Sequence, residues 1–190
     1  MKPAGLLLAA GGGRRMGTPK ALVDDPAGGS FVERGVRVLR AGRCSPVVVV
    51  VGAEAARATE LATAAGADLV VEAPDWARGQ SASLRAGVAA LQSTDAAVVC
   101  ILLVDLPDVG AAVVERVTAA VGAGAAALAR AAYHGVPGHP VVMGRDHWQG
   151  VLDVAAGDRG ARDYLATHDH ALVECGDLAT GRDVDSPDDL

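Results

Sequence analysis

The chain has 190 residues, with 17 lysines and arginines against 23 aspartates and glutamates, so its formal net charge is −6. Hydrophobic residues make up 51% and charged residues 21%, which is typical of a globular protein and excludes a disordered chain. This length predicts a single domain spanning residues 1–190. The acidic balance argues against nucleic acid or an anionic membrane as the main partner, although a few converging cations could still bind a small anion.

Segments that direct a chain to a membrane or out of the cell are not predicted. The longest uncharged stretches, residues 3–13 and 117–129, are too short to span a bilayer. The apolar run 6–8 leads into glycines and two arginines without the cleavage pattern of a signal peptide. Cys44, Cys100 and Cys175 are odd in number and widely spaced, which fits neither a disulfide framework nor a zinc site. We therefore expect a reduced, cytoplasmic protein.

The first two thirds of the chain predict alternating strands and helices. Runs rich in Val and Leu predict strands buried on both faces at residues 5–10, 46–51, 67–72 and 96–104. Helical spacing predicts helices at residues 31–39, 54–65, 81–91 and 111–121. The alternation predicts right-handed crossovers and a three-layer α/β/α, Rossmann-like domain with a mainly parallel sheet. In the first helix we expect Glu33, Arg34, Arg37 and Arg40 to face solvent.

The last third predicts a small antiparallel addition to this sheet. A fifth strand is expected at residues 125–132, and a short one at 141–143 follows breaks at Gly135, Pro137, Gly138 and Pro140. Helices at 148–155 and 161–167 flank a turn at 157–160. A strand at 171–174 and an acidic tail end the chain.

The loop after the first strand is the first candidate site, because open parallel sheets bind ligands at the carboxyl ends of their strands. Three glycines at 11–13 allow backbone amides to approach a phosphate, and Arg14, Arg15 and Lys20 add positive charge. The spacing fits neither a Walker loop nor a dinucleotide fingerprint, which needs Gly or Ala at Met16. The alternative is a flexible turn without a ligand.

Residues 8–22, which read LAAGGGRRMGTPKAL, resemble the signature loop of MobA-like nucleotidyltransferases. Enzymes of that family attach CMP or GMP to the molybdenum cofactor and are related to sugar-1-phosphate nucleotidyltransferases. The resemblance implies the sheet of the nucleotide-diphospho-sugar transferases and a loop that wraps a triphosphate. The residues implied to bind the nucleotide are Leu8, Ala9, Ala10, Gly11, Gly12, Gly13, Arg14, Arg15, Lys20, Gly79 and Ser83. Residues 23–30 depart from the tighter turn often found in the family.

Two carboxylates are candidate ligands for Mg²⁺. Asp105 follows a buried strand, where a carboxylate is costly unless a cation meets it, and a hard divalent cation is the natural partner near phosphates. By resemblance, Asp105 and Asp185 share this ion. We assign it to Asp185 and not Asp183, expecting only one of the two to face the site. The alternatives are helix capping for Asp105 or Asp108 and a solvated acidic tail for 183–189.

Weaker signals lie between these loops. Ser81 and Ser83 either contact substrate or cap the helix that follows Gly79. By resemblance, Gly138 and His139 bind the acceptor, and residues 157–162 help to form its pocket. The alternative for His139 is a structural role. Trp76 and Trp148 are expected in the core or in a pocket wall, and no zinc site is predicted at His168 and His170.

The resemblance implies a nucleotidyltransferase in which Arg15, Lys20 and Asp105 are catalytic. It implies transfer of NMP from an NTP to a phosphorylated acceptor of the molybdopterin type, with a molybdoenzyme or its chaperone as a protein partner. The resemblance also implies CTP, because family members that use CTP tend to carry Ala-Ala-Gly, as at residues 9–11, whereas those that use GTP tend to have Gly in place of Ala10. A methyl group at Ala10 is expected to narrow the space beside the base. Two alternatives remain open, an NAD(P)-linked oxidoreductase and a non-catalytic nucleotide-binding accessory protein.

Overall fold

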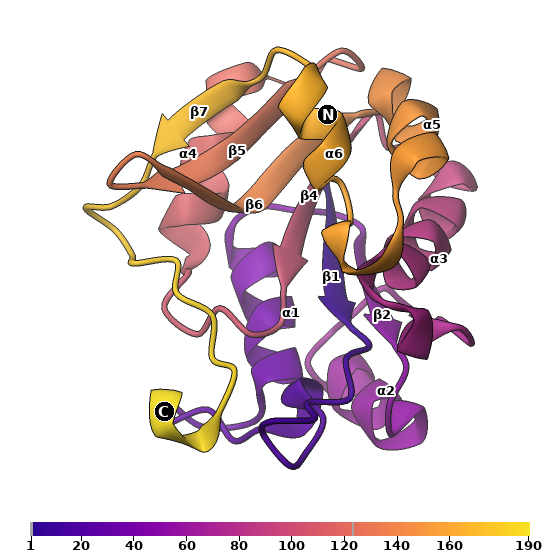
Figure 1. The fold of residues 1–190 in the computed structure, drawn as a ribbon, viewed down its shortest axis with the longest axis vertical. Helices are drawn as coiled ribbons and strands as arrows, with labels where there is room; N and C mark the ends of the chain where they lie inside the picture. The colour runs from indigo at the N-terminus through magenta and orange to yellow at the C-terminus, as the bar shows by residue number, and fades with distance from the viewer. Residues whose placement is uncertain (1, 123) are drawn as a thin grey trace.

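A computed structural model describes residues 2–122 and 124–190, which form a three-layer α/β/α domain (Figure 1). Seven strands form one sheet in the order β3-β2-β1-β4-β6-β5-β7, and β6 alone runs against its neighbours. The mainly parallel sheet and its antiparallel addition confirm the predicted fold class. The strands are β1 (Ala4–Ala9), β2 (Val47–Val51), β3 (Leu69–Glu72), β4 (Val98–Leu103), β5 (Leu128–Tyr133), β6 (Val136–Gly144) and β7 (Ala171–Glu174).

Helices cover both faces of this sheet. One face carries α1 (Phe31–Ala41), α2 (Ala55–Ala64) and α4 (Ala111–Val121), and the other carries α3 (Gln80–Gln92), α5 (Arg145–Val154) and α6 (Arg162–Thr167). Successive side chains of β1 alternate between the faces, so Leu7 packs toward α1, whereas Leu6 and Leu8 pack toward α3. Within the described residues, no helix is long and apolar enough to cross a membrane.

The β5–β6 hairpin corrects the prediction that residues 135–140 break the chain. The turn consists of His134 and Gly135, whose φ angles are 52° and 80°, and β6 starts directly after it. Only residues 141–144 of β6 pair with β4, whereas 136–140 extend beyond it and contact β5 alone. Pro137 and Pro140 are tolerated there because no strand pairs with this part of β6 on its second side, so a backbone N–H on that side is not needed as a donor.

The C-terminal segment, residues 175–190, crosses the carboxyl-end loops of the sheet. After β7 it descends along one side of the molecule and ends beside the loop that follows β1 (Figure 1). Thr180 donates its backbone N–H and its hydroxyl to Asp108, and the Val184 N–H donates to the Asp105 carbonyl oxygen over 2.9 Å. The buried Val184 side chain anchors the segment to the core, which places Asp185 at the site.

Candidate active site

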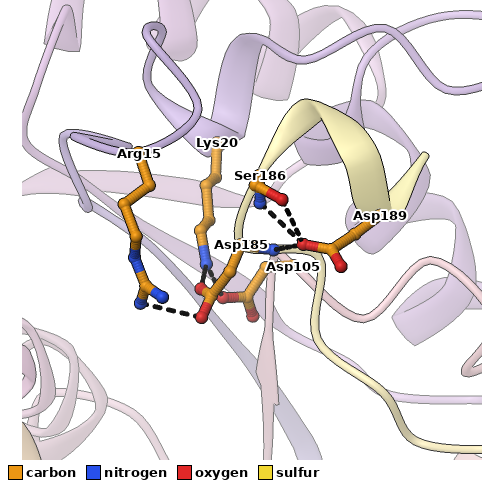
Figure 2. A network of polar contacts seen from close by, with 6 residues as sticks. All are labelled: Arg15, Lys20, Asp105, Asp185, Ser186 and Asp189. Atoms are coloured by element: carbon orange, nitrogen blue, oxygen red, sulfur yellow. Dashed lines mark hydrogen bonds and ion pairs between the residues drawn. The ribbon is translucent and has the colours of Figure 1, made fainter.

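Lys20 lies between two carboxylates from distant parts of the chain (Figure 2). Its Nζ donates to Asp105 Oδ2 over 2.7 Å and to Asp185 Oδ1 over 2.5 Å. Arg15 Nη2 lies 2.8 Å from the other oxygen of Asp185. Because both carboxylates contact one nitrogen, they lie close enough together to contact one small ligand.

Each of these side chains is fixed by its local structure. Lys20 is the first residue of the 3-10 turn η1 (Lys20–Leu22), and Asp105 comes directly after Val104, at the end of β4. Asp185 precedes Ser186, whose capping box with Asp189 begins the short turn η4 (Pro187–Asp189). The Asp189 carboxylate also accepts the Asp185 N–H over 3.1 Å (Figure 2), which fixes the backbone at Asp185.

The charges of this cluster stabilise one another. Burial alone would lower the pKa of Lys20, but Asp105 and Asp185 outweigh that effect and raise it above its usual value. The pKa of Asp185 is lowered, chiefly by the hydrogen bond from Lys20 and further by Arg15. Asp105 Oδ1 is buried and has no hydrogen-bond partner within the described residues. A buried carboxylate oxygen without a partner is an acceptor available to a ligand.

A cavity of about 360 Å³ opens beside the loop that follows β1. Of the residues expected to bind a nucleotide, it is lined by Leu8, Ala10, Gly11, Gly12, Gly13, Arg14, Lys20, Gly79 and Ser83, and Asp105 lies at its edge. Ala9 instead packs into the core on the α1 side, and Arg15 lines a second cavity. At Gly13, φ is +57° and an added Cβ would lie 1.9 Å from the Thr18 carbonyl oxygen, so this turn requires glycine.

Trp76 forms one wall of the first cavity. A pocket wall is one of the two locations predicted for it. It begins the short turn η2 (Trp76–Arg78), and its ring lies across two glycines. A Cβ added to Gly12 would lie 3.0 Å from the ring, and one added to Gly52 would lie 2.5 Å from it. Trp148 is fully buried and belongs to the core.

A second cavity, of about 670 Å³, adjoins the first and shares Lys20 and Asp105 with it. Gly138, His139, Asp183 and Asp185 line it. The expectation that only one of Asp183 and Asp185 faces the site is therefore wrong. Residues two apart in an extended chain share a face, and here the intervening residue is the one that is buried.

Arg130 on β5 and Arg162 at the start of α6 also line the second cavity, beside His139. Burial lowers the pKa of His139 to about 4, and the charges of both arginines contribute. His139 is therefore neutral near pH 7. Arg162 falls within residues 157–162, which the resemblance implied for the acceptor pocket. Sequence reasoning missed Arg130, although a single charge within the alanine-rich strand predicted at 125–132 was a usable signal.

Arg34 corrects the expectation that the charged residues of α1 all face solvent. Its guanidinium donates to the carbonyl oxygens of Leu106 and Val109 over 3.2 and 3.1 Å, and pairs with the buried carboxylate of Asp25. It thereby joins the chain before α1 to the loop that follows Asp105. The helical periodicity could not reveal this contact because the loop is distant in sequence.

The proposed helix caps are also wrong. The N-cap residues are Gly79 for α3 and Gly110 for α4, so none of the proposed side chains caps either helix. The first N–H of α3, that of Gln80, instead donates to Asp158 Oδ1 over 3.4 Å. Ser83 is buried and lines the first cavity, whereas Ser81 lines a groove behind it. Asp108 instead holds the C-terminal segment through Thr180.

We predict that an NMR titration of the His139 ring has its midpoint near pH 4, well below the usual 6.5. Arg130→Met raises that midpoint because removing a nearby cation makes the imidazolium less unfavourable. Arg37→Met removes the same charge from an exposed site on α1 and leaves the midpoint unchanged. A wild-type midpoint at 6.5 contradicts the desolvation of His139 beside the two arginines.

Comparisons with known proteins identify relatives along almost the whole chain. The profile of a family described as "MobA-like NTP transferase domain" matches residues 5–172. A protein of Paenarthrobacter nicotinovorans named nicotine blue oxidoreductase is 33% identical over 98% of this chain and 93% of its own length.

Solved structures share the fold. Rv0371c of Mycobacterium tuberculosis H37Rv is 27% identical, with a TM-score of 0.76 over 100% of this chain and 96% of its own. The same protein was also solved as a complex with manganese, with 26% identity and a TM-score of 0.75 over 100% and 96% of the two chains. A nucleotidyl transferase from Methanothermobacter thermautotroptrophicus is 21% identical, with a TM-score of 0.76 over 99% and 94%. Because the family profile matches residues 5–172, the chain belongs to the MobA-like NTP transferase family.

Proposed function

We propose that the protein is a nucleotidyltransferase that moves NMP from an NTP, with CTP favoured, to a phosphorylated acceptor of the molybdopterin type. The observation that carries this proposal is a pair of adjoining cavities that meet at Lys20 and Asp105. A glycine-rich loop lines one cavity and cations line the other. Two anionic substrates bound in them would meet at the shared residues. We further propose a molybdoenzyme or its chaperone as the recipient of the product.

The first cavity suits a triphosphate. The backbone N–H groups of Gly11, Gly12 and Gly13 donate to no other group in the described parts of the chain. Free amides in a glycine-rich turn bind phosphate oxygens, and Arg14 and Lys20 add charge at the same wall. Trp76 offers an aromatic surface beside them.

The reaction would be an in-line displacement at phosphorus. A phosphate oxygen of the acceptor attacks the α-phosphorus of the NTP. The bond between the α-phosphorus and the oxygen that links it to the β-phosphorus breaks, and pyrophosphate leaves with the electron pair. Positioning and charge neutralisation suffice for such a transfer. Lys20 and Arg15 would neutralise charge on the leaving pyrophosphate, so no protein nucleophile is required.

The two carboxylates suit a divalent cation, and we propose Mg²⁺. Asp105 Oδ1 lacks a partner, and within the described residues no third His, Cys, Asp or Glu joins the pair. Mg²⁺ is commonly held by one or two carboxylates together with substrate phosphates and water. Asp105 and Asp185 would hold the ion, which would supply positive charge that stabilises the pyrophosphate leaving group. The manganese complex of the 26% identical mycobacterial protein supports a divalent ion at this fold.

The proposal is tested by measuring pyrophosphate release with each of the four NTPs, with and without Mg²⁺ and a molybdopterin acceptor. Release that needs an NTP, the metal and the acceptor together supports it. Tight NTP binding without any turnover, for the acceptors tried, favours the non-catalytic accessory protein instead.

A second candidate, an oxidoreductase, is favoured by the name of the 33% identical relative. The sequence after β2 weighs against it. Dinucleotide-binding enzymes place an acidic residue there, whereas this chain has Gly52 and Ala53, and the exposed Glu54 comes one position later. An oxidoreductase predicts a change in nicotinamide absorbance that does not depend on Mg²⁺. That change, without pyrophosphate release, overturns the transferase proposal.

We predict that Asp105→Asn and Asp185→Asn each abolish turnover while the protein stays folded. Each removes one negative charge from the pair proposed to hold the metal, and the amide keeps the shape of the side chain. Turnover at several metal concentrations and circular dichroism check this. Full activity in either variant contradicts the shared ion.

Lys20→Ala should weaken nucleotide binding and slow the transfer. The expected loss of transition-state stabilisation is about 2–4 kcal/mol, by analogy with the removal of one donor to a developing charge. Steady-state kinetics with CTP give the value. Arg37→Met serves as the charge-matched control, and kinetics of Lys20→Ala equal to those of the control would make the loop purely structural.

We predict a higher kcat/KM for CTP than for GTP, and a weaker preference in Ala10→Gly. Ala10 is buried and lines the first cavity, so its methyl group would narrow the space beside the base. A pyrimidine tolerates this narrowing better than guanine, and removing the methyl leaves the phosphate-binding residues unchanged. A wild-type enzyme that prefers GTP overturns the assignment.

A further inference from the structure

Arg130 and Arg162 are two cations of the second cavity without carboxylate partners. Arg130 lies on β5 and Arg162 begins α6, and both line the cavity beside His139. Neither forms an ion pair within residues 2–122 and 124–190. By contrast, Arg159, which lines the same cavity, pairs with Asp163 over 3.2 Å.

The position of Arg130 is electrostatically unfavourable. Its side chain is half-buried, and burial together with the charge of Arg162 lowers its pKa. Its Nε donates to the Gly138 carbonyl oxygen over 3.2 Å, and no described residue accepts from its two terminal nitrogens. Like charges held close together in a partly desolvated cavity repel each other, and a bound anion would relieve the repulsion.

We propose that Arg130 and Arg162 form a subsite that binds an anionic group of the acceptor, a phosphate or a carboxylate. Guanidinium groups bind such oxyanions through paired, charge-assisted hydrogen bonds. Neutral His139 beside them has an N–H that can donate to the same group. That the bound molecule is the acceptor rests on the proposed function, whereas the anion subsite itself does not.

The location of the pair explains how it would select a substrate. The arginines line the same cavity as Lys20 and Asp105. The residues that it shares with the first cavity are Lys20, Gln80, Leu103, Asp105 and Asp158. A molecule anchored at the arginines would therefore share one space with the proposed transfer site. Acceptors without an anionic group would lose this anchor. Arg130 and Arg162 would therefore increase the affinity for the acceptor and leave the affinity for the nucleotide unchanged.

The subsite is tested with inorganic phosphate and acetate as probes, on the full chain with CTP and Mg²⁺ already present to occupy the glycine-rich loop. The NMR signals of the His139 ring report binding in the second cavity. We expect Arg130→Met and Arg162→Met each to weaken phosphate binding by about tenfold or more, since each removes a charge-assisted hydrogen bond. Arg37→Met, with the same change in charge outside both cavities, should bind phosphate as the wild type does.

Three outcomes separate the subsite from the proposed function. CTP binding that all variants retain, with phosphate binding lost only in the Arg130 and Arg162 variants and pyrophosphate release in the wild type, supports both. Phosphate affinity equal in Arg130→Met, Arg162→Met and Arg37→Met overturns the subsite alone. Phosphate binding that depends on the two arginines, in a protein that binds none of the four NTPs, overturns the nucleotidyltransferase and leaves the subsite. Tighter binding of acetate than of phosphate assigns the group as a carboxylate.

Discussion

The bridge from Lys20 to Asp105 and Asp185 is the interaction on which the candidate site depends. It joins the first loop of the sheet, the end of β4 and the C-terminal segment at one point (Figure 2). Two carboxylates this close would repel each other without a cation between them. In the protein without a bound metal, the ammonium group of Lys20 therefore holds together the two carboxylates that are proposed to share a divalent ion. Such preorganisation lowers the cost of assembling the site when substrate binds.

Much of the fold could be predicted because its sheet is built from uninterrupted apolar runs. The strands β1, β2 and β4 are buried on both faces, and their Val and Leu runs allow few other interpretations. The prediction that the strand at 67–72 is buried on both faces is wrong, because β3 lies at one edge of the sheet and its residues Leu69 and Glu72 are exposed. The error at β6 has a physical origin. Proline is a reliable sign against a central strand, but residues 136–140 have a neighbour on one side only, and that depends on where β4 ends.

The candidate site could be predicted only where residue type alone indicates the chemistry. Glycines, cations and an aspartate at strand ends are recognisable without a structure, and the resemblance led to Asp185. Arg34 and Trp76 act through contacts with segments distant in sequence. Periodicity describes one helix at a time, so it could not show that Arg34 supports the loop after Asp105 or that Trp76 needs glycine at Gly12 and Gly52.

The distribution of charge connects the acidic composition with the binding of anions. At a net charge of −6 the surface as a whole repels an anion. Cations and aspartates together line the two adjoining cavities, but Arg130 and Arg162 lack carboxylate partners among the described residues, so the positive charge is least compensated there. Fields focused in a cleft by low-dielectric walls are stronger than those of exposed charges, which solvent and salt screen. An anionic small molecule would therefore be attracted to these cavities and repelled by the rest of the surface. A long polyanion such as nucleic acid would meet mostly repulsion.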